Sequence, residues 1–265
     1  MSNNLIESES MIAAVRRREI CKILTREKSV NATELAEKFG VGISTIRRDL
    51  DALHDEGKLS RVHGGAVIKE TAMPRIPYQQ ARDSNLSQKI QIAEAALAFL
   101  PESGNIFIGG GTTSYQFALR MPANPALCVT TNGLDIAAHI ASNRLCPVDF
   151  AGGTIRPESL QSNCEEALET LYWDVTFMSV AALDITRGIT TDNRNTAHQE
   201  QLIYRHGSKF VALCDSSKIG RFAYAHVAPV SIIDVLVTDQ GITGEQVQQL
   251  EEQGVQVVVA GDGKA

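Results

Sequence analysis

Residues 109–114 read GGGTTS and directly follow a short apolar stretch, 105–108. Glycines leave backbone N–H groups accessible, and N–H groups at the start of a helix bind anions. The segment thus combines a strand, a glycine turn, three hydroxyl side chains and the start of a helix. This arrangement favours the binding of a single phosphate group. Backbone N–H groups and the side chains of Thr112, Thr113 and Ser114 would hold it. The alternative is an ordinary strand-to-helix turn, in which glycines are common.

The same segment argues against two nucleotide-binding motifs. A dinucleotide fingerprint requires G-x-G-x-x-G, and Ser114 stands where its third glycine would be. A P-loop requires G-K-[ST], and the segment has no lysine. The histidines and cysteines show no metal-ligand spacing, and the chain lacks the G-x-S-x-G elbow of a serine hydrolase. We therefore expect neither a metal nor a cofactor, and no catalytic residues.

The elements that would position this phosphate site read as an open α/β fold. Strand candidates are nearly all apolar, which is typical of a parallel sheet covered on both faces. They occupy 105–108, 127–131, 148–151, 175–180, 209–214, 232–238 and 255–260, with helical patterns such as 134–141 and 245–253 between them. Ligands of such folds bind at the carboxyl ends of the strands.

Further polar segments follow these strands and would converge on the same edge. They are TTNG (130–133), AGG (151–153), LDITRG (183–188) and CDSSK (214–218). Lys218 follows a buried strand closely enough to reach an anion, although an isolated lysine is more often a surface residue. Asp184 and Asp215 could accept hydrogen bonds from sugar hydroxyls, or could equally cap helices. The predicted effector-binding residues are Gly110, Gly111, Thr112, Thr113, Ser114, Thr131, Asn132, Gly153, Asp184, Asp215 and Lys218.

The first 70 residues predict a different unit. A helix over 11–27 precedes a second helix over 31–40, with Asn31 as N-cap, Glu34 at the capping-box position and Gly40 after its end. A three-residue turn leads to a third helix, whose apolar residues Ile43, Ile46, Leu50 and Leu53 share one face. Gly57 ends this helix, and KLSRV and AVI then flank HGG as a tight hairpin.

Two helices joined by a tight turn and followed by a β wing describe a winged helix-turn-helix. Residues 11–70 hold 12 Lys or Arg and 9 Asp or Glu, whereas residues 71–265 hold 13 and 20. A basic head on an acidic body suggests two separate roles. The alternative is a small helical unit with a solvated charged face. The predicted DNA-contacting residues are Thr33, Ser44, Thr45, Arg47, Arg48, Lys58, Arg61 and His63.

The segment VGISTIRRDLDALHDEGKLSRVHGGAV resembles the DNA-binding head of the DeoR family of bacterial transcriptional regulators. The matching positions run from Val41 through Thr45 to Leu50, then from Leu53 to Ala66. The departure is Gly42, where the family usually has a serine that caps the recognition helix. Glycine caps almost as well as serine, so we expect the helix to form, with one hydroxyl contact in doubt.

The resemblance extends through about residue 240, over RDSNLSQKIQIAEAA, GGGTTS, VTTNGLDIA, AGG, DITRGIT and CDSSKIGRFA. The DeoR sensor domain is similar in fold to ribose-5-phosphate isomerase, which implies a phosphorylated sugar or sugar acid as the inducer. It places the phosphate at residues 112–114, with Lys218 nearby. Asn163 and Cys164 depart from the family pattern. So does Thr196, which stands where the related isomerase needs a carboxylate base, although Glu200 follows one turn later.

These observations predict a winged helix-turn-helix over 11–68, with the helix-turn-helix at about 30–49 and the wing at 58–68. A linker over 69–85 and an effector-sensing, ribose-5-phosphate-isomerase-like α/β domain over 86–265 would follow. We expect a repressor of a sugar or sugar-acid catabolic operon that binds operator DNA as a homodimer or homotetramer. It would not be an enzyme. The alternatives are an active sugar-phosphate isomerase with a DNA-binding head, and a chromosome-associated protein with a vestigial body.

Five scattered cysteines and the absence of a long apolar run predict a cytoplasmic protein without a membrane segment.

Overall fold

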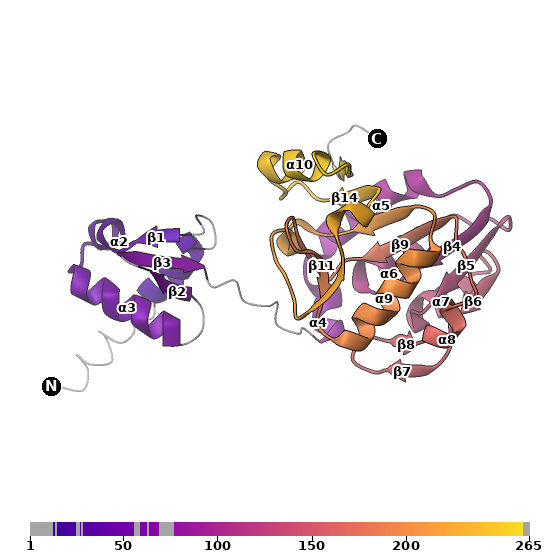
Figure 1. Cartoon of the computed structure of the whole chain (residues 1–265), viewed down its shortest axis with the longest axis horizontal. Helices are drawn as coiled ribbons and strands as arrows, with labels where there is room; N and C mark the ends of the chain where they lie inside the picture. The colour runs from indigo at the N-terminus through magenta and orange to yellow at the C-terminus, as the bar shows by residue number, and fades with distance from the viewer. Residues whose placement is uncertain are drawn as a thin grey trace. The chain divides into compact units, whose positions relative to one another are not determined.

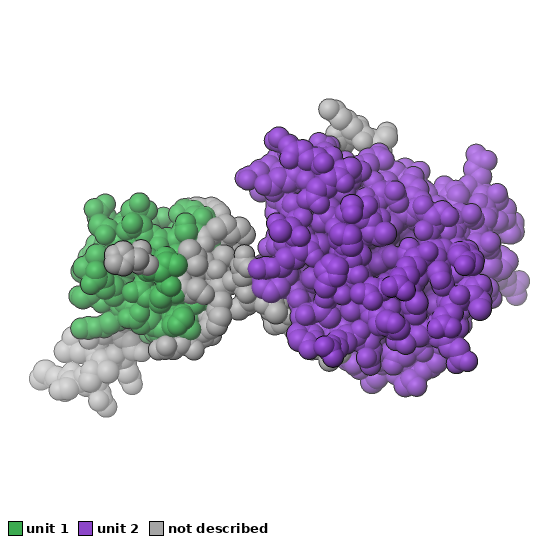
Figure 2. All heavy atoms as spheres, viewed as in Figure 1, with its two compact units in different colours: residues 1–71 green, residues 72–265 purple. Residues whose placement is uncertain are grey.

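The computed structural model of the chain forms two compact units, residues 1–71 and 72–265 (Figure 2). It describes residues 13, 15–24, 27, 29–55, 59–62, 64–68 and 77–261. Figure 1 shows the elements of each unit. The second unit begins with a short helix among its described residues, α4 (Tyr78–Asp83). This helix occupies part of the segment 69–85, which the sequence predicted to be a linker. The two prolines before it concealed this short helix from sequence reasoning.

The first unit contains the predicted helices. Residues 15–24 are helical and precede α2 (Ala32–Phe39) and α3 (Ile43–Asp55). The Asn31 side chain caps α2 by accepting from the Thr33 N–H at 2.8 Å, and Gly40 ends it in the left-handed conformation with a φ of 62°. The turn has the predicted three residues but lies one residue earlier, at Gly40 to Gly42, because Ile43 is already helical. Gly42 caps α3 through its carbonyl, which accepts from the Thr45 N–H at 2.9 Å.

A single hydrophobic cluster holds the first unit together. Leu35 of α2 packs with Ile46, Leu50 and Leu53 on one face of α3, and all four are buried. Ile43, predicted to belong to this face, is 39% exposed. It begins the helix and is not part of the hydrophobic cluster.

The wing is a hairpin of β2 (Leu59–Val62) and β3 (Gly65–Ile68), as predicted. A further strand, β1 (Ser29–Asn31), pairs with β3 on its other side. Sequence reasoning missed β1 because a three-residue strand with one apolar residue has no detectable period. The pairing requires a glycine, since a Cβ at Gly65 would lie 2.0 Å from the Val30 carbonyl oxygen.

The second unit is built on a parallel sheet with the strand order β15-β14-β12-β9-β4-β5-β6. All seven predicted strands are present and every neighbouring pair is parallel. The strands are β4 (Gly104–Ile108), β5 (Leu127–Thr131), β6 (Val148–Phe150), β9 (Val175–Ser179), β12 (Phe210–Leu213), β14 (Val235–Thr238) and β15 (Gln256–Val259). The predicted strand at 232–238 begins three residues late, because a 3-10 turn occupies Val230–Ile232.

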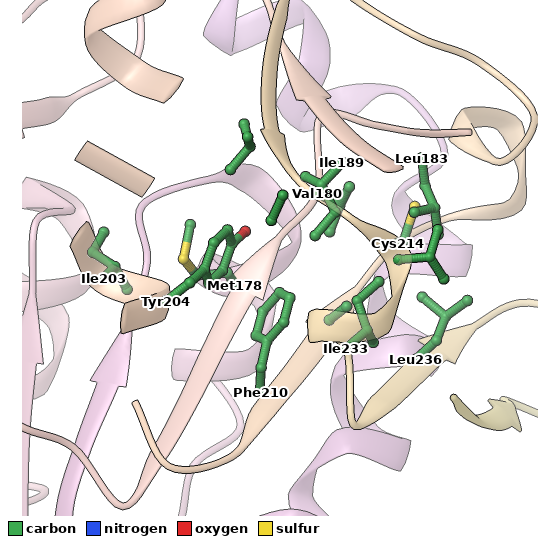
Figure 3. Packing of buried hydrophobic residues seen from close by; sticks show 14 of the residues in the cluster. Met178, Val180, Leu183, Ile189, Ile203, Tyr204, Phe210, Cys214, Ile233 and Leu236 are labelled. Carbon is green, nitrogen blue, oxygen red and sulfur yellow. The ribbon is translucent and has the colours of Figure 1, made fainter. Parts of the chain in front are cut away.

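Side chains of the sheet alternate between two hydrophobic clusters, one on each face. Ile106 and Ile108 of β4 pack with α5 (Leu86–Ala96), α6 (Thr112–Ala118) and α7 (Leu134–Ser142). Phe107 packs on the other face with α8 (Glu165–Leu168), α9 (Arg194–His206) and α10 (Gly244–Glu251). Figure 3 shows this second cluster, in which Phe210 of the sheet lies near Tyr204 of α9, and Leu236 lies near Ile233.

Two small antiparallel structures were not predicted. A hairpin joins β7 (Thr154–Arg156) to β8 (Gln161–Asn163), and a sheet joins β10 (Ala182–Asp184), β11 (Gly188–Thr191) and β13 (Ala225–Ala228). Their strands have three or four residues, too few for a period to show. They lie in segments that the sequence assigns to loops, and the first of them forms a wall of the functional site. Two 3-10 turns, Leu97–Phe99 and Ser216–Lys218, complete the unit.

Candidate functional site

The recognition helix α3 presents a polar face to solvent. Ser44, Arg47 and Arg48 are exposed, whereas Thr45 is half-buried. Among the described residues none pairs with Arg47 or Arg48 through a hydrogen bond or an ion pair. Thr33 is exposed at the start of α2. Two unpaired guanidinium groups near the N-terminal end of a recognition helix suit contacts with guanine edges and with phosphates.

The wing residue Arg61 differs from these two arginines. Its Nε lies 2.9 Å from Asp51 of α3, and its Nη1 donates to the Gly65 carbonyl at 2.9 Å. Arg61 therefore holds the wing against α3, and any contact with DNA would use the rest of its guanidinium. Lys58 and His63, also predicted to contact DNA, lie outside the described residues, as does Gly57.

Sequence reasoning gave Asp49 no role of its own, but the structure gives it one. Asp49 is 5% exposed, and its carboxylate lies 2.5 Å from the Arg16 Nε and 3.5 Å from the Arg17 Nε. These ion pairs fix the first helix to the inner side of α3. The aspartate of the T-I-R-R-D-L motif thus positions the recognition helix and does not face solvent.

We expect Asp49→Asn to destabilise the first unit by about 2–4 kcal/mol, because it leaves two partly buried guanidinium groups without their carboxylate. Chemical denaturation of the full chain followed by far-ultraviolet circular dichroism measures this change. The fluorescence of Trp173, the single tryptophan, reports the second unit separately. The control is Asp51→Asn, which removes a carboxylate that is 60% exposed. Equal effects of both substitutions would contradict the structural role of Asp49.

The second unit contains a pocket of about 240 Å³ at the carboxyl ends of β4, β9 and β12. Its wall includes Gly110 to Thr112 after β4, Ser179 to Ala181 after β9, and Lys218 after β12. The remaining wall includes Tyr78, Arg156, Gln161, Thr191 to Asn193, Thr196 and Glu200. The predicted convergence of the strand ends is therefore confirmed, and it brings four of the predicted effector-binding residues into one pocket: Gly110, Gly111, Thr112 and Lys218.

The glycine turn is shaped by contacts that exclude a side chain. Gly111 has a φ of 150°, and a Cβ on it would lie 2.9 Å from the Ser179 Cβ. A Cβ on Gly110 would lie 2.5 Å from the Gln161 Cγ. Among the described residues, none accepts a hydrogen bond from the N–H groups of Gly111 or Thr112. Both residues line the pocket, so these donors suit a small anion there.

Lys218 supplies a cation to the same pocket. Its Nζ donates to the Val180 carbonyl at 3.1 Å and lies 3.5 Å from the Asp215 carboxylate. An ammonium group has three N–H donors, so donor capacity remains for a ligand. The two neighbours hold the side chain in one orientation, which supports the prediction that Lys218 faces an anion.

Asp215 itself lies behind Lys218 and outside the pocket wall. It is 2% exposed and accepts from Asn85 at 3.2 Å and from Ser217. Burial, the largest single influence, would raise the pKa of its carboxyl, but Lys218, Ser217, Lys89 and Asn85 together outweigh it, and the pKa is lowered. Asp215 thus positions Lys218, and the prediction that it binds sugar hydroxyls is not supported.

The other predicted effector-binding residues also lie outside the wall. The Ser114 hydroxyl lies 2.9 Å from the Ser179 hydroxyl, and Thr113 is fully buried. The Thr131 hydroxyl donates to the Ile108 carbonyl at 2.5 Å, and the Asn132 Oδ1 accepts from the Gly110 N–H at 2.7 Å. These buried contacts fix the glycine turn from behind.

Gly153 and Asp184 serve the small antiparallel structures. A Cβ at Gly153 would lie 1.8 Å from the Asn163 carbonyl oxygen, so this glycine allows the approach to β8. Asp184 accepts from the N–H groups of Thr186 and Arg187 at 3.0 and 2.8 Å, which fixes the turn between β10 and β11. Both were expected near the ligand because they follow a strand or a glycine pair.

Thr196 and Glu200 do line the pocket, in the first turns of α9. The Thr196 hydroxyl accepts a hydrogen bond from Arg156. Burial raises the pKa of Glu200 to about 8, and the nearby Arg156 guanidinium lowers it only in part. The protonated form of Glu200 is therefore favoured over a wider pH range than that of an exposed glutamate.

We expect Glu200→Gln to leave the free energy of unfolding unchanged near pH 4 and to raise it by at least about 1 kcal/mol at pH 9. The folded-state pKa exceeds the unfolded-state value of about 4.3, so ionisation costs folded-state stability as the pH rises between the two values. Denaturation followed by Trp173 fluorescence at both pH values tests this. Glu102→Gln, at an exposed carboxylate, is the control. A stabilisation that is the same at both pH values would refute the assignment.

No helix formed by the described residues is long and apolar enough to cross a membrane. Within the same residues, no group of three or more His, Cys, Asp or Glu side chains could hold a metal ion.

Comparison with known families covers both units. Residues 16–72 match the DeoR-like helix-turn-helix domain, and residues 84–240 match the DeoR C-terminal sensor domain. The chain belongs to the DeoR family of transcriptional regulators. The matched relatives are named as transcriptional regulators and not as enzymes.

Full-length relatives of the regulator share about a quarter to a third of its residues. GlpR of Haloferax volcanii, an HTH-type transcriptional regulator, is 30% identical over 251 residues, which cover 94% of this chain and 98% of that one. The putative aga operon transcriptional repressor of Escherichia coli O157:H7 is 27% identical over 269 residues, which cover 99% and 100%. UlaR of Shigella dysenteriae, also an HTH-type transcriptional regulator, is 28% identical over 250 residues, which cover 94% and 99%.

Among solved structures, ribose-5-phosphate isomerase A from Methanocaldococcus jannaschii aligns with a TM-score of 0.39 and 17% identity. The alignment covers 51% of the regulator and 55% of the isomerase.

Proposed function

We propose that the regulator represses a sugar or sugar-acid catabolic operon and that a phosphorylated sugar or sugar acid relieves this repression. The observation that carries the proposal is the pocket of the second unit. It combines the unused N–H groups of Gly111 and Thr112 with the Lys218 ammonium, a donor set that suits a phosphate. The volume of about 240 Å³ suits a phosphorylated sugar better than a nucleotide.

DNA binding is assigned to α3 and the wing. Ser44, Arg47 and Arg48 are the exposed residues of α3 that would contact base edges and phosphates, with Thr33 and Thr45 at the margins. One winged helix forms a small interface with DNA. We therefore propose that the regulator binds repeated half-sites as a homodimer or homotetramer.

The effector would act by changing the balance between two states of the regulator. A ligand relieves repression only if it binds the DNA-free state more tightly than the DNA-bound state. The pocket provides the ligand contacts, and the recognition helix provides the DNA contacts on the other unit. Coupling between them is therefore an allosteric linkage between two sites.

An electrophoretic mobility shift with the DNA upstream of the regulator's own gene tests this function. We expect sequence-specific retardation that a phosphorylated sugar or sugar acid reverses. Retardation that is equal with unrelated DNA, or absent altogether, would contradict the proposal. A thermal-shift screen of the same compounds identifies binders independently, because a bound ligand stabilises the folded state by RT ln(1 + [L]/Kd).

A further inference from the structure

Arg156 occupies the pocket wall formed by the unpredicted β7–β8 hairpin. It faces Gln161 across the hairpin, and its Nη2 donates to the Gln161 Oε1 at 2.8 Å. Gln161 in turn donates from Nε2 to the Gly110 carbonyl at 2.6 Å. The other terminal nitrogen of Arg156 donates to the Thr196 hydroxyl. Thus the guanidinium is oriented from two sides and tied to the glycine turn.

The partners that orient Arg156 are neutral. Among the described residues, no carboxylate lies within ion-pair distance of its guanidinium, and its Nε is buried without a hydrogen-bond partner. A half-buried cation normally has an anionic partner, because removing an unpaired charge from water is costly. The described residues thus orient this cation in the pocket wall without a carboxylate at ion-pair distance.

The start of a helix adds to the positive field of Arg156. Its partner Thr196 lies in the first turn of α9, a helix of 13 residues whose N-terminus carries a partial positive charge. Burial raises the pKa of Glu200, in the same part of the wall, to about 8, which disfavours its ionised form. The carboxyl groups of Glu158 and Asp192 also lie in the pocket wall, so the attraction for a negative group is centred on Arg156 and the start of α9.

The remaining donors indicate the kind of anion. The two terminal nitrogens of a guanidinium carry four N–H groups, of which Thr196 and Gln161 use two. Two donors in one plane match the two oxygens of a carboxylate. A protonated Glu200 could donate one more hydrogen bond to the same group.

We propose that Arg156 binds a carboxylate of the effector, so that the effector is a phosphorylated sugar acid and not a phosphorylated aldose. The Lys218 side of the pocket holds the phosphate. The Arg156 side distinguishes a carboxylate from an aldehyde at the opposite end of the ligand. This inference rests on the proposed function, since it specifies the ligand of the same pocket.

Isothermal titration of the full-length regulator with matched pairs of compounds tests the inference. Ribose 5-phosphate is compared with 5-phosphoribonate, and glucose 6-phosphate with 6-phosphogluconate, which differ within each pair only in the oxidation of C1. For at least one pair we expect the acid to bind about 10-fold or more tightly than the aldose, as a charged hydrogen-bonded pair requires. Arg156→Gln should reduce this ratio to less than about 3-fold, and Arg156→Lys should retain part of it.

The control is Arg194→Gln. Arg194 is exposed in the first turn of the same helix and does not line this pocket, so its loss should leave the ratio unchanged. Two results would overturn this inference and leave the proposed sugar-phosphate sensor standing. One is equal affinity of the wild type for acid and aldose, and the other is a preference for the acid that persists in an Arg156→Gln variant of unchanged melting temperature. Binding of none of the four compounds would count against the proposed sugar-phosphate sensor as well.

Discussion

Replacing Arg47 and Arg48 together by alanine is expected to weaken binding to operator DNA by about 100-fold or more. Each arginine that contacts a base edge contributes about 1–3 kcal/mol of specific binding. Both side chains are exposed on α3, and neither is engaged by another described residue. Their removal should therefore affect DNA contacts and leave the buried face of the helix intact.

Fluorescence anisotropy with labelled operator DNA at fixed salt measures this loss. The control is Lys22→Ala, which removes one positive charge from the first unit, where the double variant removes two, at a side chain that is 65% exposed on the first helix. Lys22→Ala should reduce affinity by no more than a general charge effect of a few-fold. A double variant with an unchanged melting temperature and an affinity for operator DNA within about 3-fold of the wild-type value would contradict a role of Arg47 and Arg48 in base recognition.

Replacing Lys218 by glutamine is expected to abolish the response to the effector while operator binding persists. The substitution removes the cation that faces the phosphate, and the loss of a charged hydrogen bond at a phosphate costs about 1.5–3 kcal/mol, roughly 10- to 150-fold in affinity. Asp215 loses one partner, but Asn85 and Ser217 still donate to it. The second unit should therefore remain folded.

Titration of the variant with the four compounds above measures the change in affinity, and Trp173 fluorescence on denaturation confirms that it folds. Lys209→Gln is the matched control, since Lys209 precedes the opposite end of the same strand, β12, and contacts Phe99. If the Lys218→Gln variant binds a phosphorylated ligand as tightly as the wild type does, the phosphate does not contact Lys218.

The sequence predicted the parts of the fold that have strong periodic signals. The seven apolar strands, the caps at Asn31 and Gly40, and the inner face of α3 at Ile46, Leu50 and Leu53 all follow from local rules. Ile43 shows the limit of this reasoning, because periodicity places a residue on a face but does not say how far the core extends along the helix.

The site was only partly predictable, for a similar reason. Residues that follow long strands, such as Gly111 and Lys218, were found because the carboxyl ends of parallel strands must converge. Arg156 and Gln161 belong to three-residue strands without a period, and their pairing across the hairpin becomes visible only in three dimensions. Asp215 lies against Lys218, and sequence spacing does not show whether a polar side chain faces the ligand or the residue that binds it.

The most direct test of the account is operator release. A complex of the full-length regulator with labelled operator DNA is titrated with whichever of the four compounds binds most tightly, and anisotropy is recorded for wild type and Lys218→Gln. The account predicts that the wild-type complex dissociates at ligand concentrations near the measured Kd, and that the Lys218→Gln complex persists there. A wild-type complex that remains intact at saturating ligand would contradict the claim that this pocket controls DNA binding.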